Sequence, residues 1–208
     1  MIGEIHKPKN IAQANFESSV WDRMYQSYEH LVPMETREFG LTECVQAVEE
    51  IFSPELFRDW DSLSAETKES LVKEYADRVA SAFDLVRYEG VFFEDMDSRL
   101  LGYNNGDGSI HLNKEYLSNN MISPIELIDT ITHELRHQYQ SEAIKGLHAV
   151  SHDVIKEWKA GAEMYTTNSP YVYDPFGYMY NPLEIDSNYA SNTVIREVTK
   201  DMINGKWA

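Results

Sequence analysis

The amino-acid sequence predicts an α+β fold that is mainly helical, with a small antiparallel sheet. Apolar side chains recur at helical spacing up to about residue 85 and again after residue 124, while short β-rich segments and a turn signal lie between them. A chain of 208 residues with 42% hydrophobic residues can bury one core. We therefore expect one domain over residues 1–208, with a helical region at 1–85 and the sheet and later helices at 86–208.

Four helices are expected in the first 85 residues. The segments 17–32 and 41–52 show helical spacing of apolar residues, and Thr42 is the expected N-cap of the second. A Ser-Pro pair opens the segment 53–60, because proline is favoured in the first turn of a helix. The segment 64–86 is the longest and carries apolar residues one turn apart: Leu71, Tyr75, Val79 and Phe83.

Two or three strands are expected between residues 86 and 113. The run 104–108, Asn-Asn-Gly-Asp-Gly, is a strong signal for a tight turn between two of them. The segment 108–113, Gly-Ser-Ile-His-Leu-Asn, is then the strand that directly precedes the next helix.

Three helices are expected after the sheet. The first spans about 124–142, and its start is marked by Ser123 as N-cap, a proline at the first position and Glu126 to complete a capping box. The segment 150–165 is a further helix candidate. The last helix spans about 182–203.

The charge of the chain argues against two classes of partner. Acidic residues number 35 and basic residues 18, for a net charge of −17, so the chain repels nucleic acids and anionic membranes. A lone cysteine, Cys44, cannot form an internal disulfide. Neither a Sec-type signal nor a long apolar run is visible. We expect a cytoplasmic protein, or one exported without a Sec-type signal peptide.

The segment 130–140, Thr-Ile-Thr-His-Glu-Leu-Arg-His-Gln-Tyr-Gln, carries the clearest chemical signal. His133 and His137 lie four residues apart on a predicted helix, so both imidazoles share one face and can reach one metal ion. Glu134 lies about 100° round the helix, where it can serve as a general base. The opposite face is apolar: Ile125, Ile128, Ile131, Leu135 and Tyr139. The alternative is a solvent-facing helix with two ordinary histidines.

This His-Glu-x-x-His segment resembles the active-site helix of the zincin metallopeptidases. The resemblance implies one Zn²⁺ per chain, held by His133 and His137 and a third ligand, with Glu134 as the base that activates water for hydrolysis of a peptide bond. It also implies an edge strand before the helix that pairs with the substrate. The segment 108–113 takes that place, so Ile110 and His111 are candidate substrate contacts; the alternative is an ordinary strand of the sheet.

The third ligand predicted from the sequence is Glu184. Gln140 and Ala143 replace the glycine and histidine of the metzincin subgroup, which is thereby excluded. The segment 182–190, Pro-Leu-Glu-Ile-Asp-Ser-Asn-Tyr-Ala, resembles a pattern of compact gluzincin-type proteins of phage and toxin-like bacterial origin, except that Ser187 stands where that pattern has alanine. The resemblance implies that Glu184 binds the metal.

Other roles for these helices remain open from the sequence alone. The Asn-Pro-x-Glu start at 181–184 matches the pattern at 123–126, so the alternative for Glu184 is a capping role. Asp186 is expected to orient a histidine or to pair with Arg136, and Asp129 is a further candidate to support the ligands.

Two more groups of side chains are candidates for the site. His148 and His152 form a rival pair four residues apart, for which surface positions are the expected alternative. Five tyrosines around the start of the last helix are candidates to stabilise an oxyanion, with Tyr180 also a candidate substrate contact; the alternative is that they pack the loop: Tyr171, Tyr173, Tyr178, Tyr180 and Tyr189.

The predicted function is therefore a zinc metallopeptidase that acts on a protein or peptide substrate. Three alternatives remain: a catalytically inactive zincin-like domain that binds metal or a partner, a hydrolase of a non-peptide amide, and a helical interaction protein in which the motif is accidental. An inhibitory partner is not identified by the sequence.

Overall fold

The structure is a computed structural model that describes residues 29–97, 101–104, 106–167 and 180–206. The expected α+β class is confirmed, because 67% of the described residues are helical and the described strands form one small sheet. No helix among the described residues is both long and apolar enough to cross a membrane.

The described part of the N-terminal region, from residue 29 onward, is helical, as predicted. The segment 17–32 lies outside the described residues except for its end, which forms a short 3-10 helix. The elements before the sheet are η1 (Glu29–Leu31), α2 (Met34–Arg37), α3 (Leu41–Ile51), α4 (Pro54–Asp59), η2 (Trp60–Ser62) and α5 (Ala65–Ala82). On α5, Tyr75 and Val79 are fully buried and Phe83 follows them into the core, while Leu71 is partly buried against it.

The start of α3 corrects the predicted cap. Gly40, with φ 75°, takes the N-cap position, and Thr42 lies inside the helix. A Cβ atom at Gly40 would lie 2.6 Å from the carbonyl oxygen of Ala82, so only glycine allows this approach to the end of α5. Tertiary contact rather than local capping therefore sets the start of α3.

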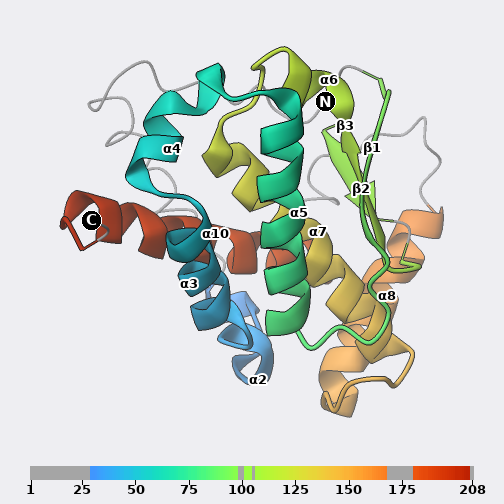
Figure 1. The fold of residues 1–208 in the computed structure, drawn as a ribbon. Coiled ribbons are helices and arrows are strands. Elements are labelled where there is room, and N and C mark those ends of the chain that lie inside the picture. The colour runs from blue at the N-terminus through green and yellow to red at the C-terminus, as the bar shows by residue number, and fades with distance from the viewer. Residues whose placement is uncertain (1–28, 98–100, 105, 168–179, 207–208) are drawn as a thin grey trace.

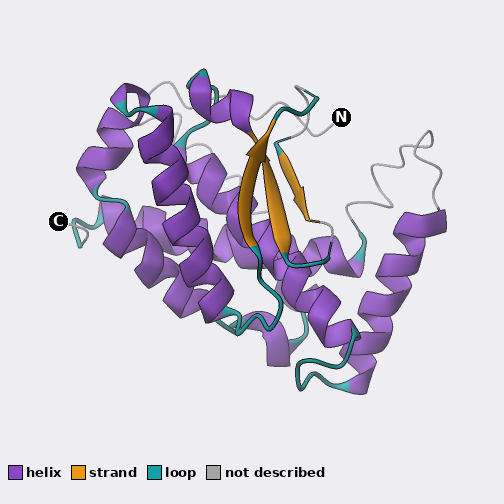
Figure 2. Cartoon of the chain, turned by 45° about the vertical axis from the view of Figure 1, so that its right-hand side comes forward, coloured by secondary structure: helices purple, strands orange, loops and turns teal. Residues whose placement is uncertain are grey.

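The sheet is mixed, which corrects the antiparallel expectation. Its strands are β1 (Gly90–Glu94), β2 (Gly102–Asn104) and β3 (Ser109–Asn113), in the order β1-β3-β2. The predicted turn joins β2 to β3 as an antiparallel pair, but β3 also pairs with β1 in parallel. The segment 108–113 is thus the centre of the sheet, not its edge, because β3 inserts between the two strands that precede it. Figure 2 shows the strands against the helices.

The later helices match the prediction closely. They are α6 (Lys114–Ser118), α7 (Pro124–Ile144), α8 (His152–Thr167) and α10 (Pro182–Ile203). The predicted capping box is present at the start of α7: the Ser123 side chain accepts from the Glu126 N–H, and the Glu126 carboxylate accepts from the Ser123 N–H.

Helix α7 is the centre of the molecule. It packs against α5, α8, α10 and the strands β2 and β3 (Figure 1). The predicted apolar stripe is confirmed at Ile128, Ile131, Leu135 and Tyr139, which are buried, whereas Ile125 is only partly buried. Because α10 packs against α7, residues from the far end of the chain reach the histidine face.

Candidate metal centre

The two histidines of α7 turn the same nitrogen atoms toward one point. His133 and His137 lie one helical turn apart, and their Nε2 atoms are 3.0 Å from each other. Their rings are nearly perpendicular, with an interplanar angle of 87° and centroids 4.6 Å apart. Both are only partly buried, so the site has access to solvent.

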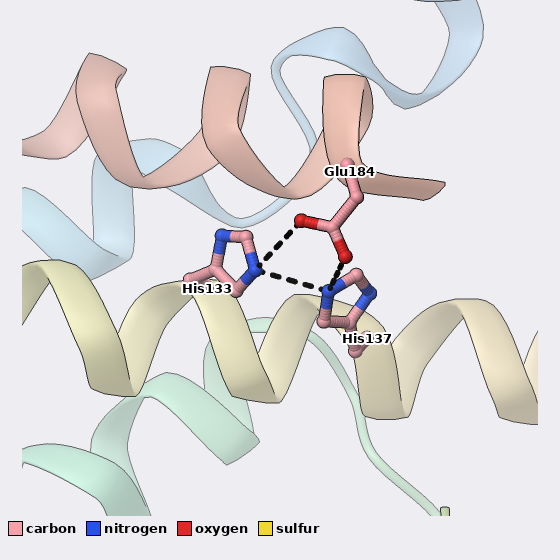
Figure 3. Close-up of side chains that lie close together, drawn as sticks. All are labelled: His133, His137 and Glu184. Carbon is pink, nitrogen blue, oxygen red and sulfur yellow. Dashed lines mark hydrogen bonds and ion pairs between the residues drawn. The ribbon is translucent and has the colours of Figure 1, made fainter. Parts of the chain in front are cut away.

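Glu184 completes this group from the first turn of α10. One carboxylate oxygen, Oε1, lies 3.3 Å from His137 Nε2, and the other, Oε2, lies 3.4 Å from His133 Nε2. Figure 3 shows the carboxylate facing both rings across the gap between the two helices. His133, His137 and Glu184 form the one group of this kind found among the described residues that could hold a metal ion.

Local structure at the start of α10 explains how Glu184 comes to face the histidines. Asn181 caps the helix itself, because its side chain accepts a hydrogen bond from the Leu183 N–H. The amide group of Asn181 also donates to the carbonyl oxygen of Gly161 in α8. Thus α8 anchors the cap of α10, and the same four-residue pattern that makes Glu126 a capping residue here directs a carboxylate onto α7.

The separations within the group fit a zinc ion. In a tetrahedral site with zinc–ligand bonds of about 2.0–2.1 Å, the ligand atoms lie about 3.3 Å apart. The three separations here are 3.0, 3.3 and 3.4 Å. Two imidazoles and one carboxylate are also ligand types that zinc takes in catalytic sites, where three protein ligands leave a fourth position open.

Without a metal, Glu184 interacts with the two histidines by charge and by hydrogen bonding. Burial by itself lowers the pKa of His137, but the hydrogen bond and charge of Glu184 outweigh it and raise that pKa to about 9. Burial likewise raises the pKa of Glu184, and the two histidines overcome this and hold it far below its usual range. A buried carboxylate is therefore kept ionised next to the imidazoles, which is the state in which it can bind a cation.

Glu134, the predicted general base, lies beside the group. It is partly buried, and its negative charge contributes to the raised pKa of His137. Its carbonyl oxygen accepts a hydrogen bond from the side chain of Asn104 in β2. Strand β2 therefore lies against α7 at the residue that would carry the base.

Asp186 takes the second of its two expected roles and pairs with Arg136. Its oxygens lie 2.7 Å from Arg136 Nε and 2.9 Å from Nη2, and both side chains are buried. It also accepts from the side chain of Gln140, which in turn contacts His137. Asp186 therefore contacts His137, the histidine it was expected to orient, only indirectly, through the side chain of Gln140.

Asp129 lies one turn before His133 on α7. Burial raises the pKa of its carboxyl group, and a hydrogen bond with Ser191 and the nearby His133 oppose that shift. Its support of the ligands stays a prediction.

The candidate substrate contacts are dispersed. Ile110 is fully buried, and both edges of β3 are paired within the described part of the sheet, so this strand has no free edge for a substrate. Tyr180 is 61% exposed directly before the Asn181 cap. Tyr189 is buried and donates a hydrogen bond to Glu38, whereas Tyr171, Tyr173 and Tyr178 lie outside the described residues.

His111 belongs to a separate network on the sheet. Its ring stacks between Phe92 and Tyr103 at centroid distances of 5.5 and 4.8 Å. Its Nε2 atom lies 2.9 Å from the Ser109 hydroxyl, and that hydroxyl donates to Asp107. Because the serine proton is already directed at a carboxylate, the Ser109–His111 contact does not have the arrangement of an activated nucleophile.

His148 and His152, the rival histidine pair, have different surroundings and do not form a metal site in the structure. His148 lies 2.9 Å from the buried Glu142 carboxylate, which also accepts from the backbone N–H groups of Val86 and Arg87. His152 is 91% exposed at the start of α8. His148 thus has a structural role, and His152 is a surface residue.

The contact between Gln140 and His137 was not predicted from the sequence, in which Gln140 was noted only as a departure from another motif. The signal that could have predicted it is the spacing of three residues from His137, which places the two side chains together on a helix.

Comparisons of the chain with protein-family models, curated proteins and solved structures found no match in any of the three. Its function is therefore inferred from the site itself.

Proposed function

We propose that this chain is a zinc-dependent metallopeptidase that binds one Zn²⁺ and hydrolyses peptide bonds. The main support is the convergence of His133, His137 and Glu184 at separations that suit tetrahedral zinc. The two histidines belong to the helix that carries Glu134, so a base lies beside the metal ligands.

The side chains divide the work of the reaction. When bound, zinc would polarise the scissile carbonyl group and lower the pKa of a coordinated water. Glu134 would accept a proton from the attacking water and pass it to the leaving amine. The buried Glu184 carboxylate would neutralise part of the positive charge of the ion. The histidines are partly exposed, so a substrate could approach the site from their side.

Strand β2 takes over the substrate role that was expected of residues 108–113. Within the described residues it pairs with β3 on one side only, and its Asn104 side chain donates to the backbone carbonyl oxygen of Glu134. An extended peptide that added to the other side of β2 would place its backbone next to the base and the metal ligands. His111 and Tyr180 remain candidate substrate contacts in this proposal.

The first test is metal content, measured by plasma mass spectrometry on purified protein. We expect about one zinc ion per chain for the wild type, in line with a three-ligand site, and a clear loss in Glu184→Ala. The matched control is Glu126→Ala, which removes a glutamate from the same position of a Pro-initiated helix but only its capping role. Wild type without zinc, or equal zinc in both variants, contradicts the proposed site.

The second test is hydrolysis of fluorescein-labelled casein. Glu134→Gln should retain zinc and lose activity by about 10²-fold or more, because it removes a general base. Zinc binding without hydrolysis of casein or of small amides would instead indicate an inactive zincin-like domain. Cleavage of small amides alone would indicate a hydrolase of a non-peptide amide.

A further inference from the structure

Gln140 contacts a metal ligand on the side that faces away from the metal. Its Oε1 atom lies 2.8 Å from His137 Nδ1, while His137 Nε2 faces His133 and Glu184. Gln140 is buried, on the same helix and almost one turn after His137. The contact therefore lies in the protein interior and not at the open side of the site.

The proton positions in this contact follow from the other bonds of Gln140. Its amide nitrogen donates to the Leu183 carbonyl oxygen at 3.0 Å and to Asp186 Oδ2 at 2.8 Å. Both partners only accept, so both amide protons are committed and Oε1 must face His137 as an acceptor. His137 must then donate from Nδ1, so that in the neutral form of the ring the lone pair lies on Nε2, where a metal ion would bind.

Asp186 is itself held in place by Arg136. The guanidinium group donates to both carboxylate oxygens and to the Thr36 carbonyl oxygen, and it lies over the rings of Phe83 and Tyr139. A rotated Gln140 amide would direct its oxygen at Asp186 and Leu183, where no proton is offered. The buried ion pair thus prevents the amide from rotating.

Ser187 is the second neighbour of His137 Nδ1, at 3.1 Å. A hydroxyl group can donate or accept, so Ser187 is compatible with either tautomer of the histidine. Gln140 alone of these two neighbours can decide which nitrogen carries the proton.

We infer that Gln140 is a positioning residue that selects the metal-binding tautomer of His137, through a chain of hydrogen bonds that begins at the buried Arg136–Asp186 pair. This inference rests on the proposed zinc site and adds a residue that acts through a ligand without touching the metal. Hydrogen-bond partners of this kind contribute about 10- to 100-fold to metal affinity.

The chain offers a matched control for this role in Gln138. It is buried on the same helix, and its amide nitrogen also donates to a backbone carbonyl and a carboxylate, those of Arg87 and Glu142. The two glutamines differ in that only Gln140 has a metal-ligand histidine at its Oε1 atom. Replacement by methionine at either position removes similar bonds from the interior at nearly constant volume.

The test compares the zinc affinities of Gln140→Met, Gln138→Met and wild type by competition with a chromophoric chelator. We expect Gln140→Met to lose about 10- to 100-fold in affinity and Gln138→Met to keep the wild-type value, although both lose thermal stability. In zinc-loaded protein, the Nδ1–H proton signal of His137 in ¹⁵N-correlated NMR spectra should persist in Gln138→Met and be lost to exchange in Gln140→Met.

The outcomes separate this inference from the proposed enzyme activity. Equal zinc affinities in the two variants, or an unchanged Nδ1–H signal in Gln140→Met, would overturn the role of Gln140 and leave the zinc peptidase standing. If the wild type binds zinc but cleaves no casein, and Gln140→Met still binds zinc more weakly than Gln138→Met, the result would support the role of Gln140 and count against the peptidase activity. A wild type that binds no zinc would overturn both.

Discussion

Replacement of Asp186 by alanine should strongly destabilise the protein even without zinc. Arg136 is fully buried, and the charge of Asp186 overcomes the effect of burial and raises the pKa of its guanidinium group, so it stays charged. Asp186→Ala leaves this cation with the Thr36 carbonyl oxygen and two aromatic rings as its main described partners. It also removes an acceptor of Gln140.

The size of the effect follows from the burial of both partners. Removal of one partner of a buried ion pair costs about 3–5 kcal/mol, because the other charge is left without compensation. For a chain of this length, each kcal/mol lowers the unfolding midpoint by about 2–4 °C, so a decrease of about 6–20 °C is expected. The double replacement Arg136→Met with Asp186→Leu should be milder, because it leaves no unpaired charge.

The assay is thermal unfolding followed by circular dichroism in EDTA, which removes the contribution of bound metal. Glu50→Ala is the control, since Glu50 pairs with Arg78 at the same 2.7 Å but both side chains are largely exposed. An exposed pair contributes about 1 kcal/mol or less. If Asp186→Ala shifts the midpoint no more than Glu50→Ala does, the reasoning from burial is wrong.

Three further predictions concern the elements around the site. Gly161→Ala should be destabilising by about 1–3 kcal/mol in urea unfolding, since its Cβ would lie 2.5 Å from Asn181 Oδ1; a gain in stability, as at an unhindered helical glycine, would contradict this close approach. Ser123→Ala should cost about 1 kcal/mol by the same method, because it removes the cap of α7; an unchanged midpoint would speak against the capping box. The pKa of His137 is raised from 6.5 to about 9 in the folded metal-free protein, so its stabilisation is complete below pH 6.5 and is lost as pH rises through about 9. Melting in EDTA at increasing pH should show this loss, and Glu184→Gln should remove it; an equal loss in both proteins would refute the assignment.

The helix with the two histidines could be predicted because its signals are local. A capping box at Ser123 and Glu126 and an apolar stripe at every third or fourth residue depend only on neighbours in the chain, and the structure reproduces both. The same is true of α10, whose predicted bounds agree with the structure. The predicted N-cap of α3 was wrong, because the close approach of Gly40 to the end of α5 determines where α3 begins.

The sheet could not be predicted in full because strand order is a property of the whole fold. The turn between β2 and β3 depends on consecutive residues of the chain, and it was predicted correctly. The parallel pairing of β1 with β3 joins residues that are 19 positions apart, such as Gly90 and Ser109. Neither segment carries a local sequence pattern from which this pairing was predicted. Because of this pairing, the central strand has no free edge within the described sheet, and we propose the substrate role for β2 instead.

The sequence by itself determined that His133, Glu134 and His137 share a capped helix, because 3.6 residues per turn places them there. It could not decide between ligand and cap for Glu184, since two helix starts carry the same Pro-x-Glu pattern. Only the tertiary structure shows where the two carboxylates lie: Glu126 completes the capping box of α7, whereas Glu184, at the start of α10, faces both histidines across the packed helices. The same packing of α10 on α7 buries Asp186 against Arg136 and brings it to the amide group of Gln140, contacts between residues that lie far apart in the sequence.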